Sequence, residues 1–300
     1  MSAAPILTLT GNLLAERTLE FAHWEEGRTQ RAQRESFQVG GKGINVSKML
    51  LRLGAPTTAL CFTGGASGAE CADWLGRRKF PCHVIATSRP TRIGVVIRGG
   101  GRAETTFLGP DIPPDAAALR SCADHLDAQP PGQVLAICGS LPGWATADFD
   151  PVRTALARWL ERGHLAADTY GPALEWLVTQ PLALVKINAS ELRTLFPAEP
   201  ASARTPELIK LAARRWPVRR WIVTDGAAPV WFHEGAGEPV SLPPPKVREV
   251  SPTGSGDVLF ACVLDALFRR GQTLAQSVAG ALPAAAANAA HPGIAEFAGP

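Results

Sequence analysis

Short apolar runs rich in β-branched residues alternate with stretches of helical periodicity along most of this 300-residue chain. The apolar runs predict strands at residues 6–10, 57–62, 134–138, 165–168, 183–187 and 221–224. Apolar positions follow the helical spacing i, i+3, i+4, i+7 at residues 46–53, and a similar stripe runs through residues 259–267. This alternation predicts βαβ units, and therefore an α/β fold whose mostly parallel sheet is covered by helices on both faces.

Two stretches interrupt the alternation. Residues 14–39 are polar and charged with modest strand character, whereas residues 92–108 have the pattern of a hairpin that turns at Gly99-Gly100-Gly101. Both stand where a βαβ fold would have a short loop. We therefore expect one domain over residues 1–300, with a small accessory sheet built from lid segments at about 12–39 and 90–109 that covers a cleft.

Composition excludes several classes of protein. The chain is 46% hydrophobic and 19% charged, as is typical of globular proteins, and its net charge of +3 is not gathered into a nucleic-acid-binding patch. The cysteines lack the spacing of a zinc site or a disulfide framework. Because the chain shows neither a signal-like segment nor a long apolar stretch, the simplest prediction is a cytoplasmic protein without a membrane partner.

The strongest local motif directly precedes the second helical stripe and reads Ser251-Pro252-Thr253-Gly254-Ser255-Gly256-Asp257. Small residues at a helix start leave backbone N–H groups free to bind a phosphate. An aspartate there would repel a bound phosphate, but it suits a base that deprotonates an attacking hydroxyl in phosphoryl transfer. The alternative is an acidic residue that is stabilised by the helix dipole. The motif alone leaves both interpretations open.

A second glycine-rich motif precedes the first helical stripe and reads Val39-Gly40-Gly41-Lys42-Gly43-Ile44-Asn45-Val46. It is neither a P-loop nor a dinucleotide-binding G-x-G-x-x-G motif. Its glycines allow the backbone to approach a ligand closely, and Lys42 and Asn45 offer donors. A tight turn with a solvated lysine remains the alternative.

With both motifs in place, the chain resembles the PfkB (ribokinase-like) family of carbohydrate kinases, and within it the kinases of sugar phosphates such as 1-phosphofructokinase and tagatose-6-phosphate kinase. Five segments match the family in order, at residues 40–46, 139–142, 168–171, 186–192 and 254–257. The resemblance implies a ribokinase-like, doubly wound, mostly parallel sheet with a small β-sheet lid, and homodimers formed through the lids. It also implies ATP and Mg²⁺ as cofactors, and leaves a requirement for a monovalent cation open.

The resemblance assigns roles to individual residues. Asp257 would be the catalytic base, and Gly254, Ser255 and Gly256 would form the anion hole beside it. The nucleotide and its metal would be held by Lys186, Asn188, Glu191, Thr224 and Gly226, with Glu191 organising Mg²⁺ through water. The residues expected to bind the sugar or sugar phosphate are Asn12, Glu16, Gly41, Lys42, Asn45, Arg92 and Ser140.

Arg92 bears on the class of substrate. Thr91-Arg92 matches the pair with which the family's sugar-phosphate kinases grip the phosphate already on their substrate, and a guanidinium suits this task because it can bind phosphate bidentately. Lys42 would be the second cation. Without the resemblance, Arg92 would be interpreted as a solvated charge on the lid.

Several positions depart from the family pattern. Among them, Glu16 replaces an aspartate, Pro252 replaces a threonine, Ile187 replaces a proline, and Asp225-Gly226-Ala227-Ala228-Pro229 lacks a second glycine. The leading hypothesis is an ATP-dependent kinase that phosphorylates a hydroxyl of a fructose- or tagatose-phosphate-like sugar. The alternatives are a free-sugar or nucleoside kinase of the same family, and a catalytically degenerate sensor that binds sugar phosphate or nucleotide.

Overall fold

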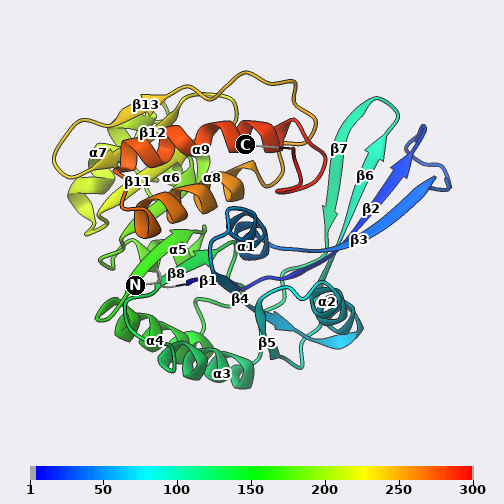
Figure 1. The fold of residues 1–300 in the computed structure, drawn as a ribbon, viewed down its shortest axis with the longest axis horizontal. Helices are drawn as coiled ribbons and strands as arrows, with labels where there is room; N and C mark the ends of the chain where they lie inside the picture. The colour runs from blue at the N-terminus through cyan, green and yellow to red at the C-terminus, as the bar shows by residue number, and fades with distance from the viewer. Residues whose placement is uncertain (1–4, 299–300) are drawn as a thin grey trace.

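A nine-stranded sheet forms the body of the computed structural model, which describes residues 5–298 (Figure 1). Its strand order is β13-β12-β11-β10-β9-β8-β1-β4-β5. Neighbouring strands run parallel from β5 to β11, and β12 and β13 continue the sheet in antiparallel fashion. The strands are β1 (Ile6–Thr10), β4 (Thr57–Thr63), β5 (Cys82–Ala86), β8 (Val134–Cys138), β9 (His164–Asp168), β10 (Leu184–Asn188), β11 (Arg220–Thr224), β12 (Val230–Glu234) and β13 (Val240–Leu242).

Helices cover both faces of this sheet, because successive side chains of its buried strands point to opposite sides. In β8, for example, Leu135 and Ile137 join one hydrophobic core, whereas Val134 and Ala136 join the other. The first core packs against α3 (Ala116–Asp127), α4 (Asp150–Leu160), α5 (Pro172–Leu177), α6 (Ala189–Thr194) and α7 (Thr205–Arg215). The second packs against α1 (Lys42–Arg52), α8 (Ser255–Leu264) and α9 (Leu274–Ala289) (Figure 1).

The predicted doubly wound α/β sheet is therefore confirmed, and each predicted strand is present with ends that differ by at most about one residue. The sequence pattern did not identify β5, β12 or β13. The second helical stripe also differs from the prediction, since α8 ends at Leu264 and a π-helical turn, η2 (Asp265–Arg269), follows it. Among the described helices, none is long and apolar enough to cross a membrane.

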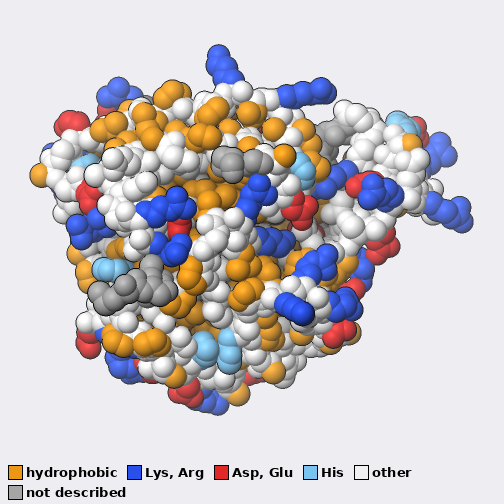
Figure 2. Space-filling view, viewed as in Figure 1, with side chains coloured by type: hydrophobic (Ala, Val, Ile, Leu, Met, Phe, Trp, Pro, Cys, Tyr) orange, Lys and Arg blue, Asp and Glu red, His pale blue; other side chains and the backbone are white. Residues whose placement is uncertain are grey.

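A separate four-stranded sheet projects from the body beside α2 (Gly65–Arg77), with the order β3-β2-β6-β7 (Figure 1). It consists of two antiparallel hairpins, β2 (Leu14–Phe21) with β3 (Arg34–Gly40) and β6 (Arg92–Gly99) with β7 (Arg102–Leu108), joined by parallel pairing of β2 with β6. The accessory sheet from two distant segments is confirmed. In the space-filling view it extends beyond the body and carries basic and acidic side chains (Figure 2).

The carboxyl ends of the parallel strands meet at the edge of the large sheet that faces the small sheet. Asn12 and Ser140 follow β1 and β8, while Asp168, Asn188 and Thr224 end β9, β10 and β11. In open α/β sheets, ligands bind at this edge. The fold thus collects polar residues from five strands at one place.

Candidate active site

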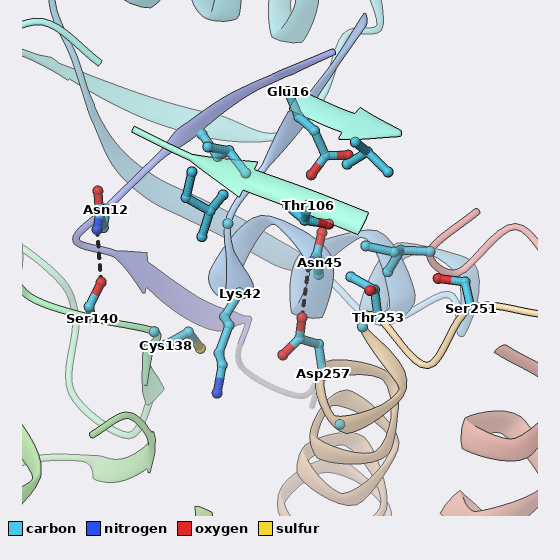
Figure 3. Close-up of a pocket in the computed structure, with 18 of the residues that line it drawn as sticks. Asn12, Glu16, Lys42, Asn45, Thr106, Cys138, Ser140, Ser251, Thr253 and Asp257 are labelled. Atoms are coloured by element: carbon cyan, nitrogen blue, oxygen red, sulfur yellow. Dashed lines mark hydrogen bonds between the residues drawn. The ribbon is translucent and has the colours of Figure 1, made fainter. Parts of the chain in front are cut away.

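A cavity of about 430 Å³ lies between the small sheet and the carboxyl edge of the large sheet (Figure 3). Most of the residues predicted from sequence line it together: Asn12, Glu16, Gly41, Lys42, Asn45, Arg92, Ser140, Lys186, Asn188, Glu191, Thr224, Gly254, Gly256 and Asp257. Ser255 and Gly226 are the predicted residues that do not line it. The structure therefore brings the two glycine-rich motifs and the first hairpin residue, Arg92, to one site.

Asp257 lies in the first turn of α8 with its side chain directed into the cavity (Figure 3). Its residue surface is only 5% exposed, and its Oδ2 accepts a hydrogen bond of 2.8 Å from Nδ2 of Asn45. Burial raises the pKa of Asp257 to about 6, although the positive charges of Lys42 and Lys186 pull the pKa the other way. A carboxylate with this pKa can hold or release a proton near neutral pH.

The turn that precedes Asp257 leaves room for a ligand. Gly254 caps α8 in a left-handed conformation (φ 78°), where a Cβ would lie 2.6 Å from Cγ2 of Ile294. A Cβ on Gly256 would lie 2.6 Å from Nζ of Lys186. The absence of side chains at both positions keeps the backbone at the positive end of the helix open to the cavity.

Ser255 is turned away from this space. Its backbone N–H donates to the carbonyl of Pro252 at 3.2 Å, and its Oγ accepts from Nδ2 of the buried Asn288 at 3.2 Å. The prediction placed Ser255 in an anion hole together with its neighbours. In the structure the Ser255 side chain faces Asn288 and does not line the cavity.

Asp168, at the end of β9, is fully buried and bridges two lysines of the cavity. Its Oδ1 lies 2.6 Å from Nζ of Lys42, and its Oδ2 lies 2.7 Å from Nζ of Lys186. Burial alone would raise the pKa of Asp168, but the two ammonium groups outweigh that effect and hold the pKa below its usual value. Burial likewise opposes the charge of Lys42, yet Asp168, Asp257 and Glu191 raise its pKa.

Sequence reasoning did not select Asp168 as a site residue, although it recognised the segment at 168–171. The available signal was a charged residue at the end of an otherwise apolar buried run. Sequence reasoning also missed further residues that line the cavity, including Gln38, Arg98, Glu104, Thr106, Tyr170, Ser251 and Thr253.

Arg92 belongs to a second polar group in the cavity. Its Nη1 lies 2.8 Å from Oδ1 of Asp111, which also accepts a 2.7 Å hydrogen bond from Nδ2 of Asn12. Asn12 in turn reaches Oγ of Ser140 at 2.8 Å (Figure 3). Lys42, which the sequence predicts as the second cation for a substrate phosphate, donates from Nζ to Oδ1 of Asp168 in this structure. Nε of Arg92 is buried and has no hydrogen-bond partner among the described residues, so the guanidinium can bind a further acceptor.

Glu16 is held on the cavity wall by the small sheet. Gln38, its partner on the neighbouring strand β3, donates from Nε2 to Oε1 of Glu16, and Nζ of Lys48 donates to Oε1 of Gln38 at 3.2 Å. Glu16 is 8% exposed. The amide of Gln38 thus orients the Glu16 carboxylate.

Glu191 is suited to organise a hydrated metal ion. Its Oε2 accepts from the backbone N–H of Asn188 at 2.8 Å in a capping box, whereas Oε1 faces Lys42 at 3.9 Å. The described residues contain no cluster of three or more acidic, histidine or cysteine side chains that would enclose a metal directly. This donor set fits Mg²⁺, which keeps several waters and relies on one or two carboxylates together with substrate phosphates.

Comparisons with known proteins agree with this geometry. The model of the pfkB family of carbohydrate kinases matches residues 11–298. The chain is 30% identical over 296 residues to a 1-phosphofructokinase of Borreliella burgdorferi, covering 97% of this chain and 94% of the relative. It is 29% identical over 191 residues to a D-tagatose-1-phosphate kinase of Bacillus licheniformis, covering 64% and 62% of the two chains.

Solved structures share the fold. Phosphofructokinase-2 of Escherichia coli in complex with fructose-6-phosphate superimposes with a TM-score of 0.84 at 22% identity, over 95% of this chain and 93% of that one. A ribokinase of Thermotoga maritima gives a TM-score of 0.74 at 19% identity, over 97% and 95% of the two chains.

Asp168, Lys42 and Lys186 form a buried ion cluster. We therefore expect Asp168→Asn to lower the free energy of unfolding strongly. This change leaves two cations without their carboxylate, and removing one partner of a buried pair costs about 3–5 kcal/mol. The exposed Asp73, which lies 3.8 Å from Arg77, is the matched control, and Asp73→Asn should cost at most about 1 kcal/mol. Urea unfolding at neutral pH measures the free energy of unfolding of both variants.

The same experiment has a pH signature. The folded protein holds the pKa of Asp168 below the value in the unfolded chain, so the stabilisation is present above about pH 4 and is lost as the pH falls further. The difference between wild type and Asp168→Asn should therefore shrink in acid. Equal losses in Asp168→Asn and Asp73→Asn would contradict the ion cluster.

Proposed function

This chain belongs to the pfkB family of carbohydrate kinases, and on that basis we propose that it transfers the γ-phosphoryl group of ATP to a hydroxyl of a ketose phosphate of the fructose- or tagatose-phosphate class. The observation that carries the proposal is that one cavity holds both Asp257, a buried carboxylate with a raised pKa, and Arg92, whose Nε has no partner in the described part of the chain. The relatives named above support the substrate class, because their names refer to kinases of ketose phosphates.

Asp257 acts in this proposal as the general base. Its carboxylate accepts the proton of the acceptor hydroxyl while the oxygen forms a bond to the γ-phosphorus, and the bond from that phosphorus to the bridging oxygen of ADP breaks. The N–H groups at Gly254 and Gly256 stabilise the charge on the transferring phosphoryl group. The proton then leaves Asp257 for solvent, which restores the base.

The nucleotide would lie along the ends of β10 and β11. Lys186 and Thr224 line this side of the cavity, and Gly226 lies in the loop that follows β11. Glu191 would hold a water of the Mg²⁺ ion, with Asn188 fixing the carboxylate. A Mg²⁺ ion held there would supply charge neutralisation during transfer. Assays should include potassium, because a potassium complex of the E. coli phosphofructokinase-2 is among the similar structures.

The acceptor would lie under the small sheet, which serves as a lid. Glu16, oriented by Gln38, is placed to accept hydrogen bonds from sugar hydroxyls, and Asn12 and Ser140 offer further partners. Asn45 contributes a buried Oδ1 that has no partner among the described residues. The backbone at Gly41 would approach the sugar most closely. Arg92 would bind the phosphate already present, displacing its contact with Asp111.

Replacing the base gives the most direct test of its role. Asp257→Asn should lower kcat by about 10²–10⁴ while the dissociation constants of both substrates change little, because the amide keeps the shape and can still accept from Asn45. Steady-state ADP release and equilibrium binding measure the two quantities. Wild-type turnover in Asp257→Asn would remove Asp257 from the base role.

The pH profile of the wild type provides a second readout of the same group. A base must be deprotonated to act, so kcat/KM should fall about tenfold per pH unit below a pKa near 6. The residual activity of Asp257→Asn should lack this acid limb. A wild-type profile that is flat from pH 5 to pH 8 would argue against a base with the raised pKa.

Arg92→Ala tests recognition of the existing phosphate. The loss of affinity should be larger for a phosphorylated ketose than for the corresponding free sugar, since a charge-assisted bidentate contact is available only to the phosphate. Titration calorimetry on the two ligands gives the ratio. An equal loss for both would show that Arg92 does not bind that phosphate.

We also propose that the chain forms a homodimer through the small sheet. Leu108 lines the cavity, so its neighbour on β7, Phe107, points to the opposite face of the sheet, where it is 60% exposed. Ile93 on the adjacent strand β6 is 53% exposed. Sedimentation should give a dimer for the wild type and a weakened one for Phe107→Glu. A wild-type monomer at micromolar concentration would exclude this dimer.

A further inference from the structure

Glu104 contacts the loop at Ser251 and Thr253 from the small sheet. This loop leads into the turn at residues 254–256, here called the anion-binding turn because the proposed function assigns it that role. Glu104 comes from β7, its side chain is 10% exposed, and its two oxygens face different parts of the molecule. Oε2 lies 2.6 Å from Nε of Arg98 on the neighbouring strand β6. Oε1 accepts from Oγ of Ser251 and from Oγ1 of Thr253, each at 3.3 Å.

Arg98 extends the bridge to the C-terminal segment of the chain. Its Nη2 donates to the carbonyl of Pro292 at 2.6 Å. Two residues further along, Ile294 packs against the face of Gly254 that a side chain would occupy. The pair Arg98–Glu104 therefore contacts both segments that flank the cap of α8.

The same loop is also held by Asn288 of α9, within the body of the protein. The fully buried Asn288 of α9 donates from Nδ2 to the carbonyl of Thr253 at 3.0 Å, and its Oδ1 accepts from the N–H of Ala295 at 2.9 Å. None of these contacts involves a residue of the small sheet. The contacts of Glu104 differ because they join the small sheet to the loop at Ser251 and Thr253, so they would break if the small sheet moved away from that loop.

We propose that the Arg98–Glu104 pair is a clasp that couples the position of the small sheet to the geometry of the anion-binding turn. Closure of the sheet brings the Glu104 carboxylate onto Ser251 and Thr253, and this fixes the loop that presents Gly254, Gly256 and Asp257. Glu104 is thus a positioning residue. Arg98 neutralises its charge, which would otherwise repel a phosphoryl group in the same cavity.

This role rests on the proposed phosphoryl transfer, but its structural part can be tested without turnover. In the full-length, ligand-free protein, Glu104→Gln should increase backbone hydrogen exchange in two separate segments, the hairpin at 92–108 and the turn at 251–257. The matched control is Glu20→Gln, since Glu20 lies on the same small sheet, pairs with the exposed Arg34 at 3.7 Å and does not line the cavity. Unchanged exchange at 251–257 in Glu104→Gln would overturn the clasp.

The kinetic signature separates positioning from binding. Glu104→Gln should lower kcat by about tenfold to a hundredfold while the KM of each substrate changes little, because a misplaced turn slows transfer more than it weakens binding. Glu20→Gln should behave as the wild type. A rise in KM at unchanged kcat would assign Glu104 to substrate binding instead and overturn the proposal.

A double-mutant cycle tests whether Glu104 acts through the loop. Ser251→Ala combined with Thr253→Val should reduce kcat in the wild-type background and have a much smaller effect in the Glu104→Gln background. If the loop substitutions lower kcat by the same factor in both backgrounds, Glu104 does not act through the loop. If the wild type transfers no phosphoryl group to any sugar phosphate, the proposed function fails, whereas the exchange measurement still decides whether the clasp exists.

Discussion

The candidate site depends on one buried interaction, the bridge from Asp168 to Lys42 and Lys186. Buried charges persist only when they are paired, so this carboxylate fixes the start of α1 and the ends of β9 and β10 in one arrangement. The charges of this bridge also act on Asp257. Burial raises the pKa of Asp257, and the same two lysines lower it. The ion cluster thus links the packing of the large sheet to the proton affinity of the proposed base.

The small sheet contributes polar side chains of its own to the cavity, among them Glu16 and Gln38. Glu16 stands where the sequence resemblance led us to expect an aspartate. Gln38 donates to Glu16 and Lys48 donates to Gln38, and this hydrogen-bonded series orients the longer side chain. Pro252 removes a backbone donor, yet Ser251 and Thr253 on either side of it use their hydroxyl groups toward Glu104. Neither Glu16 nor Pro252 contacts Asp168 through a hydrogen bond or an ion pair that the structure records.

Local patterns predicted much of the molecule because local physics determines it. Apolar β-branched runs predicted the central strands. Gly99-Gly100-Gly101 predicted the hairpin turn, where all three residues have positive φ angles that glycine adopts most readily. The glycine-rich motifs located both walls of the cavity. Contacts between distant segments could not be predicted this way: the bond from Glu104 to Ser251 joins positions 147 residues apart. The pairing of Lys42 with Asp168 could not be predicted for the same reason, because these residues are 126 positions apart. The change from α-helix to π-helix at Asp265 has no clear signal in the local sequence.

The central claim is phosphoryl transfer from ATP to a ketose phosphate, and the most direct measurement is a substrate panel. Wild-type protein with ATP, Mg²⁺ and potassium is offered fructose 1-phosphate, tagatose 1-phosphate, both 6-phosphates, and free fructose and ribose, while ADP release and ligand binding are followed together. The account predicts stoichiometric ADP and a ketose bisphosphate with at least one phosphorylated ketose. Tight binding of ATP and sugar phosphate without ADP would identify a sensor, and turnover only with free sugars would contradict the assignment of Arg92.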